Sequence, residues 1–258
     1  MKFLALADLH YNNNSVWKDG YFQSLLKDFI KNNQIDVVLI AGDVVESSFI
    51  KNDNPYRIIR KNIFSNIDIP IVFCLGNHEF AYNSIEAVFN RMNFFSDDTY
   101  DCHCLDVIGH YDVNSDIRIV GNVLWYDNTL KGISTQKDDF IVDEWLDSTI
   151  FNFTPSINCA RCKKQIKNNI KNDVSNILLT HCVPHKDLNR FSIDEPFSKY
   201  NIYSGCADFL KDLSNVEWAI CGHTHRRMNK VIHNINCVNI GNDYVYKTQT
   251  IEKFIFEV

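Results

Sequence analysis

The sequence lacks any segment that would insert into a membrane or direct export. None of its apolar runs reaches the about 18 residues that a membrane-spanning helix needs. The first residues, MKFLALADLH, do not combine a basic region, an apolar stretch and a small-residue cleavage site, as a secretory signal does. We therefore expect a cytoplasmic protein without a membrane partner. The nine cysteines, an odd number, are then expected to be reduced thiols.

An excess of positive charge, an internal repeat and a linker rich in proline or glycine are also missing. The net charge of −6 argues against nucleic acid as a partner. A chain of 258 residues that is 45% hydrophobic is long enough for a sizeable core. We expect one domain over residues 1–258. A stretch without clear periodicity, at about 127–155, is expected to be an insertion or lid near a site.

Short apolar segments alternate with helical patterns in the first part of the chain. Three of these segments, Lys2–Ala7, Ile35–Ala41 and Ile69–Leu75, have the composition of strands that are buried on both faces. Helical spacing of apolar residues lies between them, at Tyr21–Asn32 and Pro55–Asn66. The order β-α-β-α-β predicts an α/β fold with a parallel sheet and right-handed crossovers.

The rest of the chain predicts a second set of strands. A further helix is expected at Ser84–Met92, with Ser84 as its N-cap, and another at Asn158–Lys171. The expected strands are Leu105–Tyr111, Ile117–Leu124, Asn176–Thr180 and Val216–Cys221, followed by Val231–Val238 and Tyr244–Phe256, which would close a second sheet.

Five of the predicted strands end in side chains that can bind a metal ion. The candidate ligands are Asp8, His10, Asp43, Asn77, His181, His223 and His225. Open α/β sheets place their sites at the carboxyl ends of strands, so these groups are expected to meet. Nitrogen and oxygen donors without a thiolate suit manganese, iron or zinc. One ion takes about four to six ligands, so we expect two divalent transition-metal ions. Asp43, central in the order, is the natural bridge between them.

Two more polar residues follow Asn77. The side chain of His78 is expected on the opposite side of the backbone from Asn77, facing the substrate. An imidazolium there would be a suitable general acid for the leaving group. Glu79 would either orient His78 or accept a hydrogen bond from a backbone amide, and we favour the second role. Asp8 or another acid is the alternative partner for His78.

The ordered motifs resemble those of the calcineurin-like metallophosphoesterase superfamily. They are Asp8-Leu9-His10, Gly42-Asp43, Gly76-Asn77-His78-Glu79, His181 and Gly222-His223-Thr224-His225. The resemblance implies a double β-sheet sandwich flanked by helices, with a two-metal site at one edge. It implies that Asp8, His10 and His225 hold one metal, that Asn77, His181 and His223 hold the other, and that Asp43 bridges them. It also implies that His78 contacts the phosphate or protonates the leaving group.

The resemblance implies a phosphoesterase in which a hydroxide that bridges the metals attacks the phosphorus. After Asp43 the chain reads Val44-Val45-Glu46-Ser47, which departs from the Val-Asp-Arg-Gly run of protein Ser/Thr phosphatases. The segment Ile117–Tyr126 is instead similar to small stand-alone microbial phosphoesterases. We expect small phosphomonoesters or phosphodiesters, including nucleotides, as substrates. The alternatives are a nuclease, a protein phosphatase, or a non-catalytic scaffold that binds metal.

Several residues outside these motifs allow two interpretations of their role. Four thiols, Cys102, Cys104, Cys159 and Cys162, would suffice for a structural zinc ion, although ordinary reduced cysteines are the expected alternative. Arg226 and Arg227 would either contact a phosphate or face solvent, and solvent is expected. His185 follows His181 by four residues and is the strongest candidate among the remaining histidines.

Aromatic residues gather around the predicted insertion. Trp125, Tyr126 and Trp145 would either stack on a base or aryl group of the substrate, or pack residues 127–155 onto the sandwich. The packing role is the one we favour.

Overall fold

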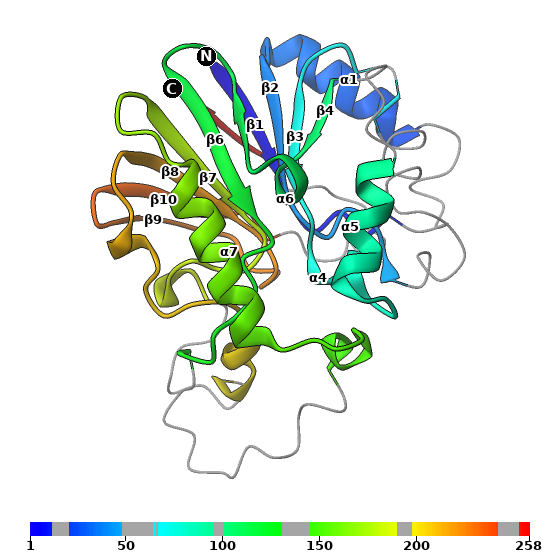
Figure 1. Cartoon of the computed structure of the whole chain (residues 1–258). Coiled ribbons are helices and arrows are strands. Elements are labelled where there is room, and N and C mark those ends of the chain that lie inside the picture. Colours follow the sequence, from blue (N-terminus) through cyan, green and yellow to red (C-terminus); the bar gives the residue numbers. More distant parts are fainter. Residues whose placement is uncertain are drawn as a thin grey trace.

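Two β-sheets packed face to face form the body of the molecule in the computed structural model (Figure 1). The structure describes residues 1–11, 21–47, 64–65, 67–94, 101–130, 145–189, 198–241 and 253–258. The predicted helix at Pro55–Asn66 lies almost wholly outside these residues. This double sheet flanked by helices confirms the predicted α/β sandwich.

The first sheet has the strand order β11-β1-β2-β3-β4. Its strands are β11 (Phe254–Glu257), β1 (Lys2–Leu6), β2 (Val37–Ala41), β3 (Ile71–Cys74) and β4 (Cys102–Cys104). The β1–β2, β2–β3 and β3–β4 pairs are parallel. The parallel order predicted from the β-α-β pattern is therefore confirmed, and the carboxyl ends of β1, β2 and β3 share one edge of this sheet.

The second sheet has the strand order β5-β6-β7-β8-β10-β9. Its strands are β5 (His110–Asp112), β6 (Ile117–Asn122), β7 (Ser175–Thr180), β8 (Val216–Cys221), β9 (Met228–Ile232) and β10 (Ile235–Asn239). The β6–β7 and β7–β8 pairs are parallel, so their carboxyl ends also lie together.

Alternation of side chains along the strands explains how the sheets and helices share the core. In β1, Phe3 and Ala5 belong to the cluster that also contains Ile119 and Leu179 of the second sheet. Leu4 and Leu6, which point to the opposite face, belong to the cluster that contains apolar residues of the helices. A strand whose side chains are buried on both faces needs an unbroken apolar sequence, as these strands have.

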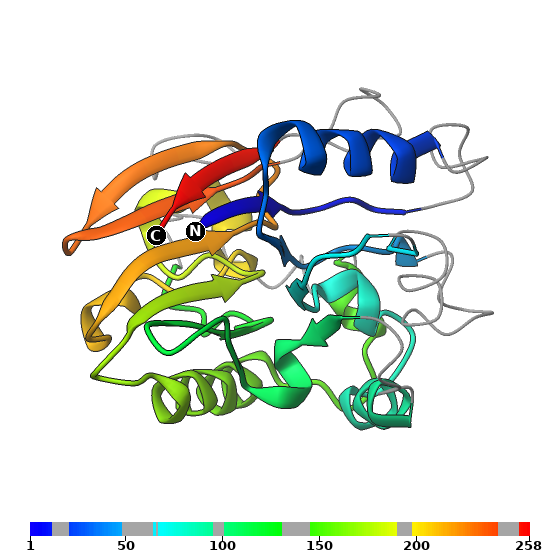
Figure 2. The same ribbon diagram turned by 90° about the horizontal axis from the view of Figure 1, so that it is seen from above.

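Helices cover the outer faces of both sheets. They are α1 (Tyr21–Asn33), α4 (Asn77–Phe80), α5 (Ile85–Phe94), α6 (Leu105–Ile108) and α7 (Pro155–Asn169), with single 3₁₀ turns at Leu146–Thr149, Lys186–Leu188, Ser198–Tyr203 and Leu210–Asp212. Figure 2 shows α1 and α7 on opposite sides of the molecule. The predicted cap of α5 is present, because the hydroxyl of Ser84 accepts a hydrogen bond from the backbone N–H of Ala87 (3.1 Å).

The predicted strand at Leu105–Tyr111 is wrong. Its first half is the helix α6, which ends where the backbone N–H of Gly109 donates to the carbonyl of Leu105 (2.8 Å). Gly109 has a φ of +82°, a conformation that glycine adopts without steric cost. Only the short strand β5 follows it.

The prediction for the end of the chain is also wrong in two respects. A turn at His233 and Asn234, both with positive φ (50° and 63°), divides Val231–Val238 into the antiparallel strands β9 and β10. The last strand, β11, joins the first sheet beside β1 instead of closing the second one. Within the described residues, no helix is long and apolar enough to cross a membrane.

Candidate functional site

The carboxyl ends of strands from both sheets meet at one place. The backbone N–H of Asp8 donates to the carbonyl of Gly42 (3.0 Å), and that of His10 donates to the carbonyl of Asp43 (2.9 Å). Across the sandwich, the backbone N–H of His223 donates to the carboxylate of Asp8 (2.9 Å). These contacts tie the loops after β1, β2 and β8 together.

The backbone at this place is strained. Asp8, His10, Asp43, His223 and His225 all have positive φ, at 50°, 45°, 48°, 69° and 53°. Non-glycine residues rarely adopt this conformation, which costs of order 1–3 kcal/mol each and tends to occur at functional sites. Five of the seven candidate ligands therefore have a backbone conformation that is unfavourable for a residue with a side chain.

Glycines next to the candidate ligands leave room for other candidate ligands. A Cβ atom on Gly42 would lie 2.5 Å from Nδ1 of His181, and one on Gly76 would lie 2.1 Å from Oδ1 of Asp43. Both distances are far below van der Waals contact. The glycines in the Gly-Asp and Gly-Asn motifs are thus needed because side chains from other strands occupy this space.

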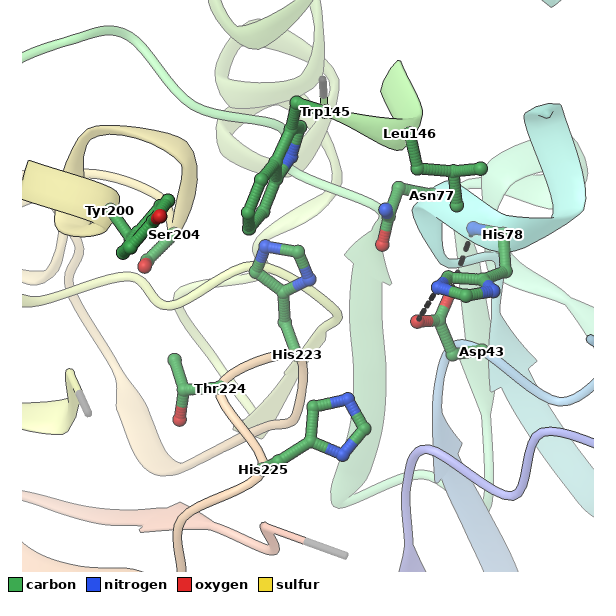
Figure 3. A pocket seen from close by; sticks show the side chains of 10 residues that line it. All are labelled: Asp43, Asn77, His78, Trp145, Leu146, Tyr200, Ser204, His223, Thr224 and His225. Atoms are coloured by element: carbon green, nitrogen blue, oxygen red, sulfur yellow. Dashed lines mark hydrogen bonds and ion pairs between the residues drawn. The ribbon is translucent and has the colours of Figure 1, made fainter. Parts of the chain in front are cut away.

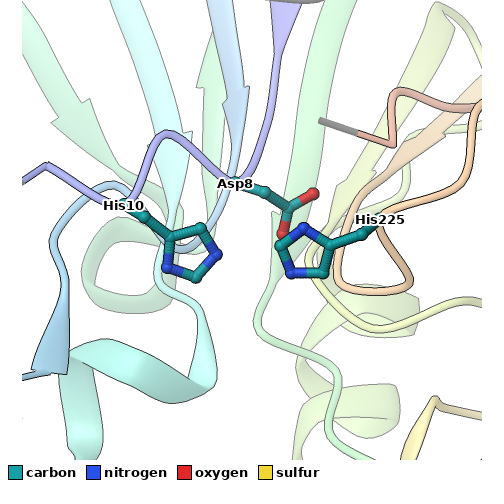
Figure 4. A group of neighbouring side chains, drawn as sticks. All are labelled: Asp8, His10 and His225. Atoms are coloured by element: carbon teal, nitrogen blue, oxygen red, sulfur yellow. The ribbon is translucent and has the colours of Figure 1, made fainter. Parts of the chain in front are cut away.

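Asp8, His10 and His225 form the first cluster of candidate ligands (Figure 4). One donor atom from each lies within 4.8 Å of those of the other two. The rings of His10 and His225 face each other at 5.1 Å between centroids. Nδ1 of His10 lies 3.2 Å from Oε2 of Glu46. A proton on Nδ1 would face this carboxylate and leave Nε2, which is 3.7 Å from Oδ2 of Asp43, able to bind a cation.

Asp43, His181 and His223 form the second cluster, and Asn77 adjoins it. Nδ1 of His181 donates to the carbonyl of Ala41 (2.9 Å), and Nε2 of His223 donates to the carbonyl of Tyr203 (2.9 Å). In its neutral form, each ring would therefore have an unprotonated second nitrogen. Such outer hydrogen bonds are what fixes the tautomer of a metal-binding histidine.

These two unprotonated nitrogens face each other. Nε2 of His181 and Nδ1 of His223 are 3.1 Å apart, and Oδ1 of Asn77 lies 3.0 Å from the same atom of His181. Lone pairs that converge without a proton between them repel each other unless a positive charge lies among them. The donor set therefore fits a bound cation.

Electrostatics at the second cluster agrees with this fit. Burial opposes the charged form of His181, but Asp43 outweighs it and raises the pKa of His181 to about 10. Burial and the neighbouring His181 lower the pKa of His223 to about 3. The cluster therefore favours one positive charge, which a proton on His181 supplies in the metal-free protein and which a bound cation would replace.

Asp43, a member of the second cluster, also lies next to the first. Its Oδ2 atom is 3.4 Å from Nε2 of His181 and 3.7 Å from Nε2 of His10. Only 1% of its surface is exposed. Burial opposes its ionisation, but the surrounding His181, His78 and His10 outweigh burial and keep the pKa of Asp43 well below its usual range. A carboxylate in this position can contact ligands of both clusters.

Glu46, which the motif analysis did not select, contacts the candidate acid His78. Oε1 of Glu46 lies 3.0 Å from Nδ1 of His78, and Nε2 of the same ring lies 3.8 Å from Oδ2 of Asp43. Burial lowers the pKa of His78, but Asp43 and Glu46 outweigh burial and raise it to about 9. Glu46 is therefore the acid that contacts His78, a partner that the sequence left unidentified. Its position shortly after the Gly-Asp motif is the only sequence feature that points to it.

Glu79 has the backbone role that we expected. It accepts hydrogen bonds from the backbone N–H groups of Val45 (2.8 Å) and Gly76 (2.6 Å). Burial and then Asp43 raise the pKa of Glu79 to about 8. Glu79 thus joins the loops after β2 and β3 from beneath the site.

A pocket of about 440 Å³ opens above the clusters (Figure 3). Its lining combines candidate ligands with apolar side chains: Asp43, Asn77, His78, Trp145, Leu146, Tyr200, Ser204, His223, Thr224 and His225. Trp145 and Leu146 belong to the predicted insertion at 127–155, of which residues 131–144 lie outside the described part. Trp125 and Tyr126 are only 1% and 3% exposed, so they pack inside and do not line the pocket.

Asp147, the second residue that the motif analysis missed, is buried beside Asn77. Its Oδ1 atom accepts from Nδ2 of Asn77 (2.9 Å), which leaves the amide oxygen of Asn77 facing His181. Burial is the main cause that raises the pKa of Asp147. No sequence motif marks this acid, because it reaches Asn77 only through the fold.

Other candidates from the sequence lie elsewhere. His185 is absent from the described pocket lining, as are the exposed Arg226 and Arg227. His185, Asp208 and His233 form a separate cluster. We call it the hairpin cluster because His233 lies in the turn between β9 and β10. There Nδ1 of His185 accepts from the backbone N–H of Asp187 (3.1 Å).

The four cysteines considered for a zinc site do not come together, in line with the expected ordinary thiols. Within the described residues, no group of three or more potential ligands joins Cys102 or Cys104 to Cys159 or Cys162. Sγ of Cys159 instead lies 3.4 Å from Sγ of Cys206. All nine cysteines are free thiols.

Comparison with one solved structure agrees with the fold. The phosphopantetheinyl hydrolase PptH from Mycobacterium tuberculosis matches with a TM-score of 0.66 and 13% sequence identity, over 96% of this chain and 91% of that chain. A dimetal phosphatase from Danio rerio matches with a TM-score of 0.49 and 14% identity, over 93% of this chain and 86% of that one. No curated protein sequence matches. The family model described as calcineurin-like phosphoesterase matches residues 1–227, and this chain therefore belongs to the calcineurin-like phosphoesterase family.

Proposed function

We propose that this protein is a phosphoesterase that uses two divalent transition-metal ions, such as manganese, iron or zinc, to hydrolyse small phosphomonoesters or phosphodiesters. The observation that carries the proposal is the pair of ligand clusters on either side of the Asp43 carboxylate. The family to which the chain belongs supports it. When bound at such a site, two cations lower the pKa of water and neutralise phosphoryl oxygens.

The side chains divide the work of holding these ions. In our proposal Asp8, His10 and His225 hold one ion, Asn77, His181 and His223 hold the other, and Asp43 contacts both. The protein contributes orientation, because Glu46, the Ala41 carbonyl and the Tyr203 carbonyl each fix the tautomer of one histidine.

His78 is proposed to donate a proton to the leaving oxygen of the ester. Its ring lines the pocket, and Glu46 accepts from Nδ1, which leaves Nε2 as the donor toward the substrate. Cations bound to Asp43 would offset the part of the pKa shift that comes from Asp43. Glu46 would then be the group that keeps His78 protonated.

The pocket supports small substrates over macromolecules. It is enclosed by the residues around Trp145 and Tyr200 on one side and by His78 on the other (Figure 3). Together with the net charge of −6, this favours a single small ester over nucleic acid. A cytoplasmic location and a single domain over residues 1–258 remain predictions.

The test is a panel of esters assayed with metal-free protein to which manganese is added. We expect hydrolysis of p-nitrophenyl phosphate or its bis ester, loss of activity on chelation, and recovery on adding the metal. Comparison of kcat/KM between monoesters and diesters then identifies the class. Less than one equivalent of bound transition metal together with no hydrolysis would support the scaffold alternative, and strong activity on DNA would overturn the preference for small esters.

A further inference from the structure

One wall of the pocket is aromatic, and the opposite side carries the candidate ligand Asn77 and the candidate acid His78 (Figure 3). Trp145 extends from above into the pocket, and Tyr200 lies on the same side (Figure 3). His78 and Asn77 line the other side. A molecule whose phosphate reaches the ligand clusters would therefore have its remaining part beside Trp145.

The rings of the aromatic wall are packed against one another. The rings of Trp145 and Tyr203 stack at 4.9 Å between centroids with an angle of 20°. Tyr203 is held in turn by the edge of Tyr126 at 5.5 Å. Tyr200 lies nearly parallel to Trp145 as well, at 6.0 Å and 23°. Parallel flat rings offer flat surfaces, which a planar group matches better than a branched one.

The same acid positions this wall and the neighbouring candidate ligand. Oδ2 of Asp147 accepts a hydrogen bond from Nε1 of Trp145 (3.2 Å), and Oδ1 accepts one from Nδ2 of Asn77 (2.9 Å). Only 3% of Asp147 is exposed. Because both partners share one buried carboxylate, the indole ring and the amide oxygen of Asn77 have a fixed separation.

The wall also lacks cationic side chains. Among the described residues that line the pocket there is no lysine or arginine. A second phosphate on the substrate would find no ionic partner there, whereas an uncharged ring would find flat apolar surface.

We propose that Trp145 stacks on a planar aromatic group carried by the alcohol part of the phosphoester, and that Asp147 is the positioning residue that sets this wall relative to Asn77. This inference rests on the proposed phosphoesterase function and adds the substrate class to it. A nucleobase and a simple aryl group share the required chemistry. Stacking of one base on an aromatic side chain is typically worth about a 5- to 150-fold effect on binding.

Two matched substrate pairs distinguish the sources of the planar group. A nucleoside 5′-monophosphate and ribose 5-phosphate share the same ester bond and differ by the base. Benzyl phosphate and cyclohexylmethyl phosphate differ only in whether the ring is flat. We expect the flat member of at least one pair to have a kcat/KM at least about 5-fold higher, mainly through KM. Equal values within both pairs would overturn the proposal, even if all four esters are hydrolysed.

Variants of the wall test its role. Trp145→Ala should remove the preference within the favoured pair, because kcat/KM should fall at least about 5-fold more for the flat member than for its partner. Phe151→Ala, in the same segment but 61% exposed and outside the pocket lining, is the matched control and should keep the preference. Equal losses on both members of a pair in Trp145→Ala would contradict stacking. Failure to hydrolyse any ester would instead count against the proposed function.

A binding readout without catalysis tests Asp147. Manganese titrated calorimetrically into metal-free Asp147→Leu protein should bind about 10- to 100-fold more weakly at one site, because leucine has no oxygen to accept from Asn77, and loss of an outer hydrogen bond to a ligand typically has this effect. Trp145→Phe, which keeps a ring but lacks the N–H, should bind manganese like wild type. Unfolding temperatures monitor whether each variant is folded. Unchanged manganese affinity in a folded Asp147→Leu protein would overturn its positioning role.

Discussion

Two clusters of histidines and a carboxylate in this protein have the same residue types but different chemistry. In the pocket, Asp43 lies beside His181 and His223, whose outer nitrogens donate to backbone carbonyls. In the hairpin cluster, Asp208 lies beside His185 and His233. There a backbone N–H donates to Nδ1 of His185, so its other nitrogen carries the proton.

The difference lies in which backbone groups surround the rings. Carbonyls behind His181 and His223 direct lone pairs into the pocket, where they converge 3.1 Å apart. The N–H behind His185 directs a proton toward Asp208, and Nε2 of His233 lies 3.1 Å from the same carboxylate. Asp208 is therefore faced by ring protons, whereas the pocket nitrogens face each other and need one positive charge among them, from a proton on His181 or from a bound cation. Residue type alone does not distinguish the two clusters.

Substitution of the two central carboxylates is expected to have the largest effect. Asp43→Asn should lower kcat/KM for p-nitrophenyl phosphate by about 10³-fold or more, because it removes the charge shared by both ligand clusters. Asp208→Asn should stay within about twofold of wild type. Steady-state kinetics with added manganese measures both. Comparable losses in the two variants would show that the clusters do not differ as proposed.

The neighbouring residues Asn77 and His78 are expected to separate metal binding from proton transfer. Asn77→Ala should weaken one metal. His78→Ala should retain both metals but slow the reaction by roughly 10²–10⁴-fold if the ring is a general acid. The loss should be smaller for p-nitrophenyl esters, whose leaving group needs little protonation, than for alkyl esters. Loss of metal from His78→Ala in elemental analysis would contradict this division of roles.

Glu46→Gln should have an intermediate effect that depends on pH. Removing this charge lowers the pKa of His78, which Glu46 helps to raise to about 9. If protonated His78 is required, the rate falls as pH rises through that pKa, so the fall should occur at lower pH in the variant. At neutral pH we expect about a 10-fold loss. Glu217→Gln, at an exposed position, is the control, and an unshifted profile in Glu46→Gln would contradict the role of Glu46.

Asp106 is a third kind of buried carboxylate, with backbone N–H groups as its partners. It accepts from Leu75 (2.7 Å) and Val123 (2.9 Å) and so connects the ends of β3 and β6. Burial raises its pKa from the usual 3.8 to about 6. The folded protein then keeps this proton where the unfolded chain has lost it, so the contribution of Asp106 to stability is largest below about pH 4 and falls as pH rises through 6.

The smallest expected effect is therefore on stability. The free energy of unfolding of wild type relative to Asp106→Asn should fall by roughly 2–3 kcal/mol between pH 4 and 7, at about 1.4 kcal/mol per pKa unit. Urea unfolding at several pH values measures this difference. A difference that is constant with pH would show that Asp106 ionises in the folded protein as it does in the unfolded chain.

The strand ends that carry the candidate ligands could be predicted from the sequence because the pattern that marks each of them is local. An apolar strand followed by a ligand-type residue identified the segments that end at Asp8, Asp43, Asn77, His181 and His223, and a glycine lies directly before Asp43, Asn77 and His223. The parallel order of β1, β2 and β3 followed from the spacing of helices between them. These signals require no knowledge of which segments meet.

The residues that sequence reasoning missed act over long distances along the chain. Asp147 contacts Asn77 seventy residues away, and β11 pairs with β1 at the opposite end of the chain. Glu46 is close to Asp43 in sequence, yet its role depends on His10 and His78 arriving from other strands. The short apolar run at Leu105–Ile108 fits a strand or a helix equally well, and tertiary packing of Asp106 decided it.

Calorimetric titration of metal into metal-free protein tests the central claim most directly. Wild type, His223→Ala and His233→Ala should be titrated with manganese under the same conditions. Our account predicts that His233→Ala binds the metal as wild type does, with roughly two equivalents, and that His223→Ala loses or greatly weakens one of them. Loss of an equivalent in His233→Ala, or unchanged binding in His223→Ala, would contradict it.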